Sequence, residues 1–254
     1  MIEKAKIQYW LYASWFNIVV RYRKTILGPL WLLASPIMFI SMLGLLYATI
    51  SNTPIDVFVP HLSVGIIVWS LITSLMNSGT NIIVHNRPKI IHSAMGLNDL
   101  VFINLFTSLL QFAHVILIIL GVWFIFKWHV TSYALVAILG VLVILINGYW
   151  YGIVFGIIGA RFRDVSEIIT ALTGALFFIT PIIWMPGNDG KGGILGPYLT
   201  YNPFYHYLEL VRAPILGTPI DPLSWKVVIC ISIFGMFLAY VFHRKFSHQL
   251  STWI

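Results

Sequence analysis

The sequence has few charged residues and almost no cysteine. Only 9% of its 254 residues are charged, against about a quarter in a soluble domain, so the composition excludes an ordinary soluble protein. The single cysteine, Cys230, lies in an apolar run, which excludes a disulfide framework and a metal site made of cysteines. The histidines do not cluster at metal-ligand spacing. We therefore expect no metal site.

The sequence also lacks a phosphate-binding loop for nucleotides. The nearest candidate, GNDGKGG at residues 187–193, has Gly192 where the loop needs Ser or Thr. The acidic residues lie in loops or near the ends of apolar segments, so a proton or sodium relay across a membrane lacks its usual carboxylate. We expect the chain to hydrolyse no ATP, to have no catalytic residues and to hold no cofactor of its own.

The sequence instead contains long apolar segments. Hydrophobic residues make up 59% of the chain, and the mean hydropathy is +0.90. A helix needs about 20 apolar residues to cross a bilayer, and lipid does not tolerate unpaired backbone groups. We therefore predict an all-α integral membrane protein, a single domain over residues 1–254, with six transmembrane helices within 29–242. The predicted spans are 29–50, 61–83, 100–126, 133–158, 166–185 and 224–242, with bends at Pro36 and Pro181.

The distribution of cations predicts the orientation of these spans. With both termini in the cytoplasm, 11 of the 15 Lys and Arg residues lie in cytoplasmic segments, which include 84–99, 159–165 and the tail 243–254. Only four lie outside, so the positive-inside rule places both termini in the cytoplasm. This bias explains the net charge of +7 without nucleic-acid binding, and membrane lipids are the expected surroundings.

Two segments outside the spans have patterns of their own. Residues 1–27 are predicted to form an amphipathic helix at the membrane interface, because Ser14, Asn17 and Arg21 make a polar stripe opposite aromatic residues. Gly28 is expected to end this helix, and Pro29 to begin the first span. Residues 186–223 are rich in aromatics and prolines, and we expect two short re-entrant helices dipping into the outer leaflet.

Two patterns within the spans leave alternatives open. Gly148, Gly152 and Gly156 share one helix face, which allows close packing either within the chain or against a second copy. A stripe in the fifth span either faces a conduit for polar cargo or packs on a neighbour while its hydroxyls bond their own helix. The stripe consists of Ser166, Thr170, Thr173, Phe177, Thr180 and Trp184.

Four stretches together resemble a known family. They are RYRKTILGPLWLLASPIMF at 21–39, GARFRDVSEII at 159–169, FFITPIIWMP at 177–186 and YNPFYHYLELVRAPILG at 201–217. In this order they are similar to permeases of type-two ABC exporters that move bacterial surface polysaccharides, and most similar to exporters of O-antigen and related lipid-linked glycans.

The resemblance implies a homodimer in the bacterial cytoplasmic membrane, working with two copies of a separate ATPase that binds ATP and Mg. It implies that the conduit for the lipid-linked glycan forms from the first and fifth spans, which adds Trp31 and Ser35 to the stripe above. Segment 186–223 would gate the conduit on the extracytoplasmic side. The implied outer-gate residues are Tyr201, Asn202, Tyr205, Glu209 and Arg212. The implied ATPase-coupling residues are Arg21, Arg23, Lys24, Arg87, Lys89 and His92.

Two other functions remain open from the sequence. A type-two permease for a drug, a lipid or teichoic acid would share the six spans. An integral-membrane enzyme acting on lipid-linked sugars would need an acid–base pair near one membrane face, and His206 with Glu209 is the nearest arrangement. No nucleophile accompanies that pair, so we expect it to stabilise the outer helix instead.

Overall fold

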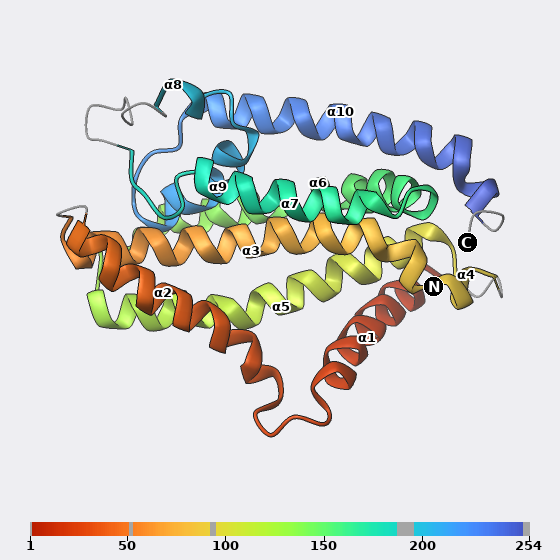
Figure 1. The fold of residues 1–254 in the computed structure, drawn as a ribbon, viewed down its shortest axis with the longest axis horizontal. Coiled ribbons are helices and arrows are strands. Elements are labelled where there is room, and N and C mark those ends of the chain that lie inside the picture. The colour runs from red at the N-terminus through yellow and green to blue at the C-terminus, as the bar shows by residue number, and fades with distance from the viewer. Residues whose placement is uncertain (1, 51–52, 92–94, 187–195, 251–254) are drawn as a thin grey trace.

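The computed structural model describes residues 2–50, 53–91, 95–186 and 196–250, and they form helices without any strand. Figure 1 shows most of the long helices running along one common direction, with α1 and α2 splayed into a V beside them. The helices are α1 (Ile2–Tyr22), α2 (Trp31–Ile50), α3 (Ile55–His85), α4 (Arg87–Ile91), α5 (Leu97–Phe126), α6 (Val136–Arg161), α7 (Asp164–Ile179), α8 (Gly196–Leu199), α9 (Pro203–Ile215) and α10 (Pro222–Phe246). Short 3-10 turns are η1 (Gly28–Leu30), η2 (Ser132–Leu135) and η4 (Ser247–Gln249).

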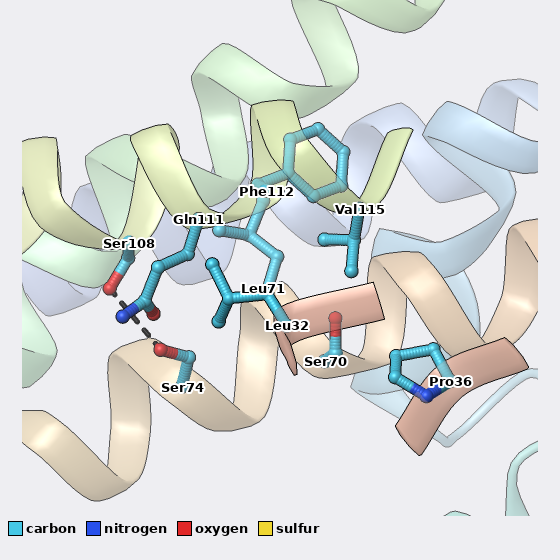
Figure 2. Close-up of a pocket in the computed structure, with 9 residues that line it drawn as sticks. All are labelled: Leu32, Pro36, Ser70, Leu71, Ser74, Ser108, Gln111, Phe112 and Val115. Atoms are coloured by element: carbon cyan, nitrogen blue, oxygen red, sulfur yellow. Dashed lines mark hydrogen bonds between the residues drawn. The ribbon is translucent and has the colours of Figure 1, made fainter. Parts of the chain in front are cut away.

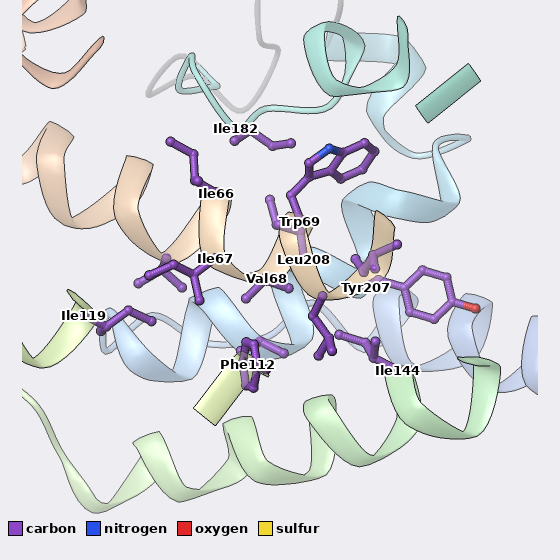
Figure 3. Packing of buried hydrophobic residues seen from close by; sticks show 14 of the residues in the cluster. Ile66, Ile67, Val68, Trp69, Phe112, Ile119, Ile144, Ile182, Tyr207 and Leu208 are labelled. Carbon is purple, nitrogen blue, oxygen red and sulfur yellow. The ribbon is translucent and has the colours of Figure 1, made fainter. Parts of the chain in front are cut away.

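Helix α3 is the centre of the bundle. It contacts α2, α5, α6, α7 and α9, and 78% of its most apolar stretch is buried, against 11% for α2 and 17% for α10. A helix that is apolar all round is stable in this central position, since every face finds an apolar partner. Figure 3 shows Trp69 and its α3 neighbours packed between Phe112 of α5, Ile144 of α6 and Tyr207 of α9.

Glycines bring α6 close to α3. An added Cβ at Gly156 would lie 2.8 Å from Ile82, and one at Gly159 would lie 2.3 Å from the Thr80 carbonyl oxygen. The glycine face that includes Gly148 and Gly152 is buried against α3 and α5 of the same chain. Of the two readings that the sequence left open, the structure supports packing within the chain.

Five helical segments are long and apolar enough to cross a membrane among the described residues. They begin at Gly28, Ile55, Leu97, Ser132 and Pro222, which are all within about six residues of the predicted span starts. Pro36 lies inside α2, and the bend expected there stays a prediction. The count of six crossings stays a prediction, because the fifth predicted span differs from the others.

The fifth span was predicted over 166–185 with a bend at Pro181, and this prediction is wrong in detail. Helix α7 has 16 residues and ends at Ile179, and Thr180 takes an extended conformation with φ −79° and ψ 137°. A residue before proline avoids the helical region because the proline ring crowds it. Pro181 therefore ends the helix instead of bending it.

The two chain ends lie at the same end of the bundle. Figure 1 places N, C and α4 together at one end, whereas α8 and α9 lie toward the other end. This arrangement agrees with the prediction that both termini and the segment around 84–99 share one side. Which side faces the cytoplasm stays a prediction.

Candidate functional site

Helix α1 is docked on α5 through its polar side. The Trp10 indole Nε1 donates to Asp99 Oδ1 at 3.0 Å, and its ring stacks on Phe102 with centroids 4.4 Å apart. Ser14 is fully buried and donates to the Ile103 carbonyl at 2.9 Å. The polar stripe of α1 therefore faces the bundle at this point.

The opposite side of α1 is aromatic and exposed, including Tyr12 at 68% and Phe16 at 53% exposure. The helix ends earlier than predicted, at Tyr22 instead of near Gly28, and the Thr25 hydroxyl caps it by donating to the Tyr22 carbonyl at 2.8 Å. Gly28 adopts a positive φ of 56° in the following turn, a conformation that glycine tolerates best. Pro29 lies in η1, which leads directly into α2, as predicted.

The predicted ATPase-coupling cations lie in two exposed places. Arg21 is in the last turn of α1, and Arg23 and Lys24 follow it; all three are exposed. Arg87 and Lys89 are exposed on the five-residue helix α4. His92 lies outside the described residues.

The predicted conduit stripe of α7 faces α3 along much of its length. The Asn81 side-chain amide donates to Ser166 Oγ at 2.7 Å, and Thr170 donates to the Ser166 carbonyl at 2.8 Å. Thr170 is exposed, whereas Thr173 is buried. Hydroxyl bonding to the helix's own carbonyls is the pattern expected for packing, and the conduit role of these residues stays a prediction.

The upper part of the stripe is aromatic. Phe177 lies between Trp69 of α3 and Phe39 of α2, with ring centroids 6.2 Å and 6.1 Å away. Trp184 lies beyond the end of α7 and so does not continue the predicted helical stripe; it is partly buried and donates its indole N–H to the Phe178 carbonyl at 3.0 Å. Phe177 thus joins the two helices that were predicted to line the conduit. On α2, the predicted conduit residues Trp31 and Ser35 are both exposed.

A buried arginine ties the outer segment to the end of α7. Arg212 of α9 is only 4% exposed and pairs with Glu209 one turn earlier on the same helix. Its Nη1 donates to the Pro181 carbonyl and lies 3.1 Å from His61 Nε2 of α3. His61 Nε2 also lies 3.2 Å from the Trp184 carbonyl oxygen. The non-helical chain after α7 therefore obtains its hydrogen-bond partners from α9 and α3.

Other polar side chains of the outer segment fix its position. Asn202 caps α9 by accepting from the Phe204 N–H at 2.9 Å, and its amide donates to buried Thr180. Tyr201 is exposed at 85%. Partial burial, together with the nearby Glu209 carboxylate, raises the pKa of Tyr205, so its hydroxyl stays protonated at neutral pH.

The predicted short helices are present as α8 and α9, whereas GNDGKGG lies outside the described residues. Their dipping into a leaflet stays a prediction. His206 and Glu209 do not form a catalytic pair in this arrangement. His206 Nδ1 lies 2.9 Å from Ser224 Oγ, and its Nε2 lies 3.0 Å from the Thr200 carbonyl, while Glu209 pairs with Arg212. Among the residues that the structure describes, no three acidic, His or Cys side chains gather as a metal site would require.

One polar face was missed from the sequence. Ser74 of α3 hydrogen bonds Ser108 of α5 at 3.3 Å, and Asn104 donates to Ser78 at 2.8 Å. Figure 2 shows the Ser74–Ser108 bond beside Gln111 in a pocket of about 150 Å³ between α2, α3 and α5. The sequence does contain a pattern that indicates this face, because polar residues recur along α3 at helical spacing. They are Ser70, Ser74, Asn77, Ser78 and Asn81.

The fold and these sites define a polytopic helical membrane protein with a tethered α1 and a packed outer segment. The family model described as "ABC-2 type transporter" matches residues 8–216. This match covers well over half of the chain, so the chain belongs to the ABC-2 type transporter family.

Individual relatives match over most of their length. The polysialic acid transport protein KpsM of Escherichia coli is 23% identical over 240 residues, covering 93% of this chain and 92% of KpsM. The O-antigen export system permease protein RfbA of Myxococcus xanthus is 23% identical over 205 residues, covering 78% of this chain and 76% of RfbA.

Proposed function

We propose that this chain is the membrane-spanning subunit that exports a lipid-linked polysaccharide across the bacterial cytoplasmic membrane. The observation that carries this proposal is the match of 93% of the chain to a polysialic acid transport protein and of 78% to an O-antigen export system permease. The KpsM match covers 93% of this chain and the family model extends to residue 216, so the likeness includes most of the outer segment as well as the spans. A permease for a drug, a lipid or teichoic acid is the alternative within the same family.

The conduit is proposed to form between two copies of the chain. Helices α2 and α7 meet at Phe39 and Phe177, and both pack on α3. Their other sides are exposed and apolar, as at Met42 with 70% and Phe178 with 63% exposure. A second copy facing these surfaces would enclose a path lined by exposed Trp31 and Thr170, where many weak contacts could hold a polymer without trapping it.

The energy is proposed to come from a separate ATPase subunit that binds ATP and Mg. The chain carries no phosphate-binding loop, and its exposed cations on α4 and at the end of α1 suit an acidic or polar partner surface. In this proposal both termini and α4 face the cytoplasm, where the ATPase is.

The first test identifies the cargo. The gene is deleted, and lipid-linked glycans are extracted from the membrane and identified by mass spectrometry. The proposal expects a lipid-linked glycan to accumulate on the cytoplasmic side and the tagged chain to co-purify with an ABC ATPase. Unchanged glycan pools, with accumulation of a drug or phospholipid instead, would support the alternative permease.

The second test concerns coupling. The double variant Arg87→Glu, Lys89→Glu reverses both charges on α4. It is expected to lower, at least severalfold, the stimulation of the ATPase subunit by this chain, because docking of the two subunits loses two favourable charges. Lys226→Glu, an exposed cation at the other end of the bundle, is the control and should leave stimulation unchanged. Equal stimulation in all three proteins would refute the coupling role of α4.

A further inference from the structure

A polar cleft opens beside α1 at the end of the bundle that carries both termini. Its volume is about 520 Å³, and α1, α3 and α5 form its walls. This volume is within the usual range of small-molecule sites. The cleft is distinct from the pocket of Figure 2, which has no residue in common with it. Its polar lining includes Asn17, Arg21, Asn77, Asn81, His85 and Asn104.

The amide oxygens at the back of the cleft are free to accept hydrogen bonds. The Asn81 amide nitrogen donates to Ser166 Oγ at 2.7 Å, and the Asn104 amide nitrogen donates to Ser78 Oγ at 2.8 Å. These bonds fix the orientation of both amides and leave each Oδ1 without a protein donor among the described residues. Hydroxyl groups of a ligand would satisfy these acceptors.

The mouth of the cleft offers donors and positive charge. The side chains of Arg21, Asn17 and His85 are exposed and make no hydrogen bond or ion pair within the described part of the chain. No Asp or Glu lines the cleft, so the Arg21 guanidinium has no counter-charge there. Water can accept a hydrogen bond from the Asn17 amide but cannot neutralise the Arg21 cation. A phosphate group can accept the same hydrogen bond and also neutralises Arg21, with which it forms strong charge-assisted bonds.

We propose that this cleft binds the head of a membrane lipid in which a phosphate is joined to a hydroxyl-bearing group. Arg21 and His85 contact the phosphate oxygens, and Asn81 and Asn104 accept hydrogen bonds from the hydroxyls. Two lipids share this chemistry: the glycosyl diphosphate end of a lipid-linked glycan and the head of phosphatidylglycerol. The first source rests on the proposed function and makes the cleft the point where cargo is received, beside the Asn81–Ser166 contact to α7.

The test is lipid binding to the complex of this chain with its ATPase, measured by native mass spectrometry in detergent. The probes are a short-chain polyprenyl diphosphate carrying one hexose, phosphatidylglycerol, and phosphatidylcholine as the zwitterionic reference. Arg21→Gln is expected to weaken binding of whichever anionic probe binds best by about tenfold or more, since a charge-assisted bond is lost. His85→Gln should weaken it less, and Arg21→Lys should retain part of it.

Lys6→Gln is the matched control, because Lys6 is an exposed cation on the same helix that neither lines the cleft nor belongs to the predicted ATPase-coupling residues. Its binding of the probes should stay within about twofold of the wild type. Neither Arg21 nor His85 has a partner in the described chain, so their neutral variants should fold normally, and an unchanged melting temperature checks this.

The two lipid sources give different results. Preferential binding of the hexose diphosphate supports a cargo site, and preferential binding of phosphatidylglycerol supports a membrane-lipid site. The inference is overturned if phosphatidylcholine binds as well as the two anionic probes, or if Arg21→Gln leaves the binding of those probes unchanged. If glycan accumulates in the deletion strain while this binding fails, only the cleft assignment is wrong. If no glycan accumulates, the proposed function fails, and the phosphatidylglycerol result alone decides the cleft.

Discussion

Single glycines set the distance between α3 and α6. At Gly159, the position of a Cβ lies 2.3 Å from a backbone oxygen of α3, and backbone cannot move aside as a side chain can. Gly121 of α5, in contrast, has open space around its Cβ position. Both glycines lie inside helices, but only Gly159 is in close contact with another helix. Comparing the same substitution at the two positions therefore distinguishes the effect of packing from the effect of backbone flexibility.

Gly159→Ala should destabilise the protein by about 2–3 kcal/mol through overpacking. This corresponds to a melting temperature lower by about 5 °C or more, measured by intrinsic fluorescence in detergent. Gly121→Ala should melt at or slightly above the wild-type temperature, because alanine favours helix. Equal melting of the two variants would show that α6 can shift away from α3 without loss.

The Arg212–Glu209 pair is the second feature at this scale. Glu209→Gln keeps the size of the side chain but leaves the Arg212 cation buried without its counter-charge. Breaking a buried pair in this way costs about 3 kcal/mol, so the variant should melt at a clearly lower temperature. Glu167→Gln, at an exposed position of α7, should melt like the wild type. A Glu209→Gln protein of normal stability that has lost export would instead favour the enzyme reading.

Sequence patterns predicted some of these residue contacts and missed others. The spacing of Gly148, Gly152 and Gly156 predicted close helix packing, because only small residues allow it. The polar face of α3 was missed because Ser and Thr occur on several sides of that helix, and only the tertiary arrangement selects Ser74 and Ser78 for α5. The Arg212 contacts were equally invisible, since they join residues about 30 and 150 positions apart in the chain.

At the scale of elements, α1 is an attached helix and not a free anchor. Its amphipathic pattern predicted that two opposite sides would differ, but the pattern could not say what each side meets. The structure directs Ser14 to α5 and leaves Phe16 exposed. Hydropathy predicted five long spans well because burial of about 20 apolar residues dominates their energetics. The end of α7 escaped prediction because Pro181 permits either a kink or a stop.

Two tryptophans on α1 test this attachment. Trp10→Ala removes the bond to Asp99 and the stacking on Phe102, so amide hydrogen exchange along α1 should accelerate by about tenfold, which is about 1.4 kcal/mol. Trp15→Ala removes a side chain that is 49% exposed and should leave exchange near the wild-type rate. Faster exchange in both variants would mean that general hydrophobicity holds α1 in place.

At the scale of the whole molecule, the bundle has two different ends. One carries both termini, α4 and the cleft that includes Arg21, and the other carries α8, α9 and the Arg212 contacts. A transporter needs such asymmetry, because cargo is received on one side of the membrane and released on the other. The assignment of each end to a compartment rests on the distribution of cations.

Labelling of introduced thiols tests this orientation. In a Cys230→Ser background, a cysteine replaces either Lys89 of α4 or Tyr198 of α8, which is 63% exposed. In intact cells a membrane-impermeant maleimide should label only Tyr198→Cys, and Lys89→Cys should react only after permeabilisation. The reverse labelling pattern would show that α4 faces the outside of the cell, where it could not contact a cytoplasmic ATPase.

The early stop of α7 has a consequence for how the chain is assembled. Its 16 residues extend about 24 Å, which is less than the roughly 30 Å of hydrocarbon. If α7 is the predicted fifth span, the irregular backbone after it must cover the remaining distance, and its carbonyls at Pro181 and Trp184 meet Arg212 and His61. In that case the crossing cannot be completed during synthesis until the chain about 30 residues downstream has emerged and folded back. For this predicted span we therefore expect a joint insertion of α7 and α9, in which the crossing becomes stable in lipid only after the ribosome has finished both.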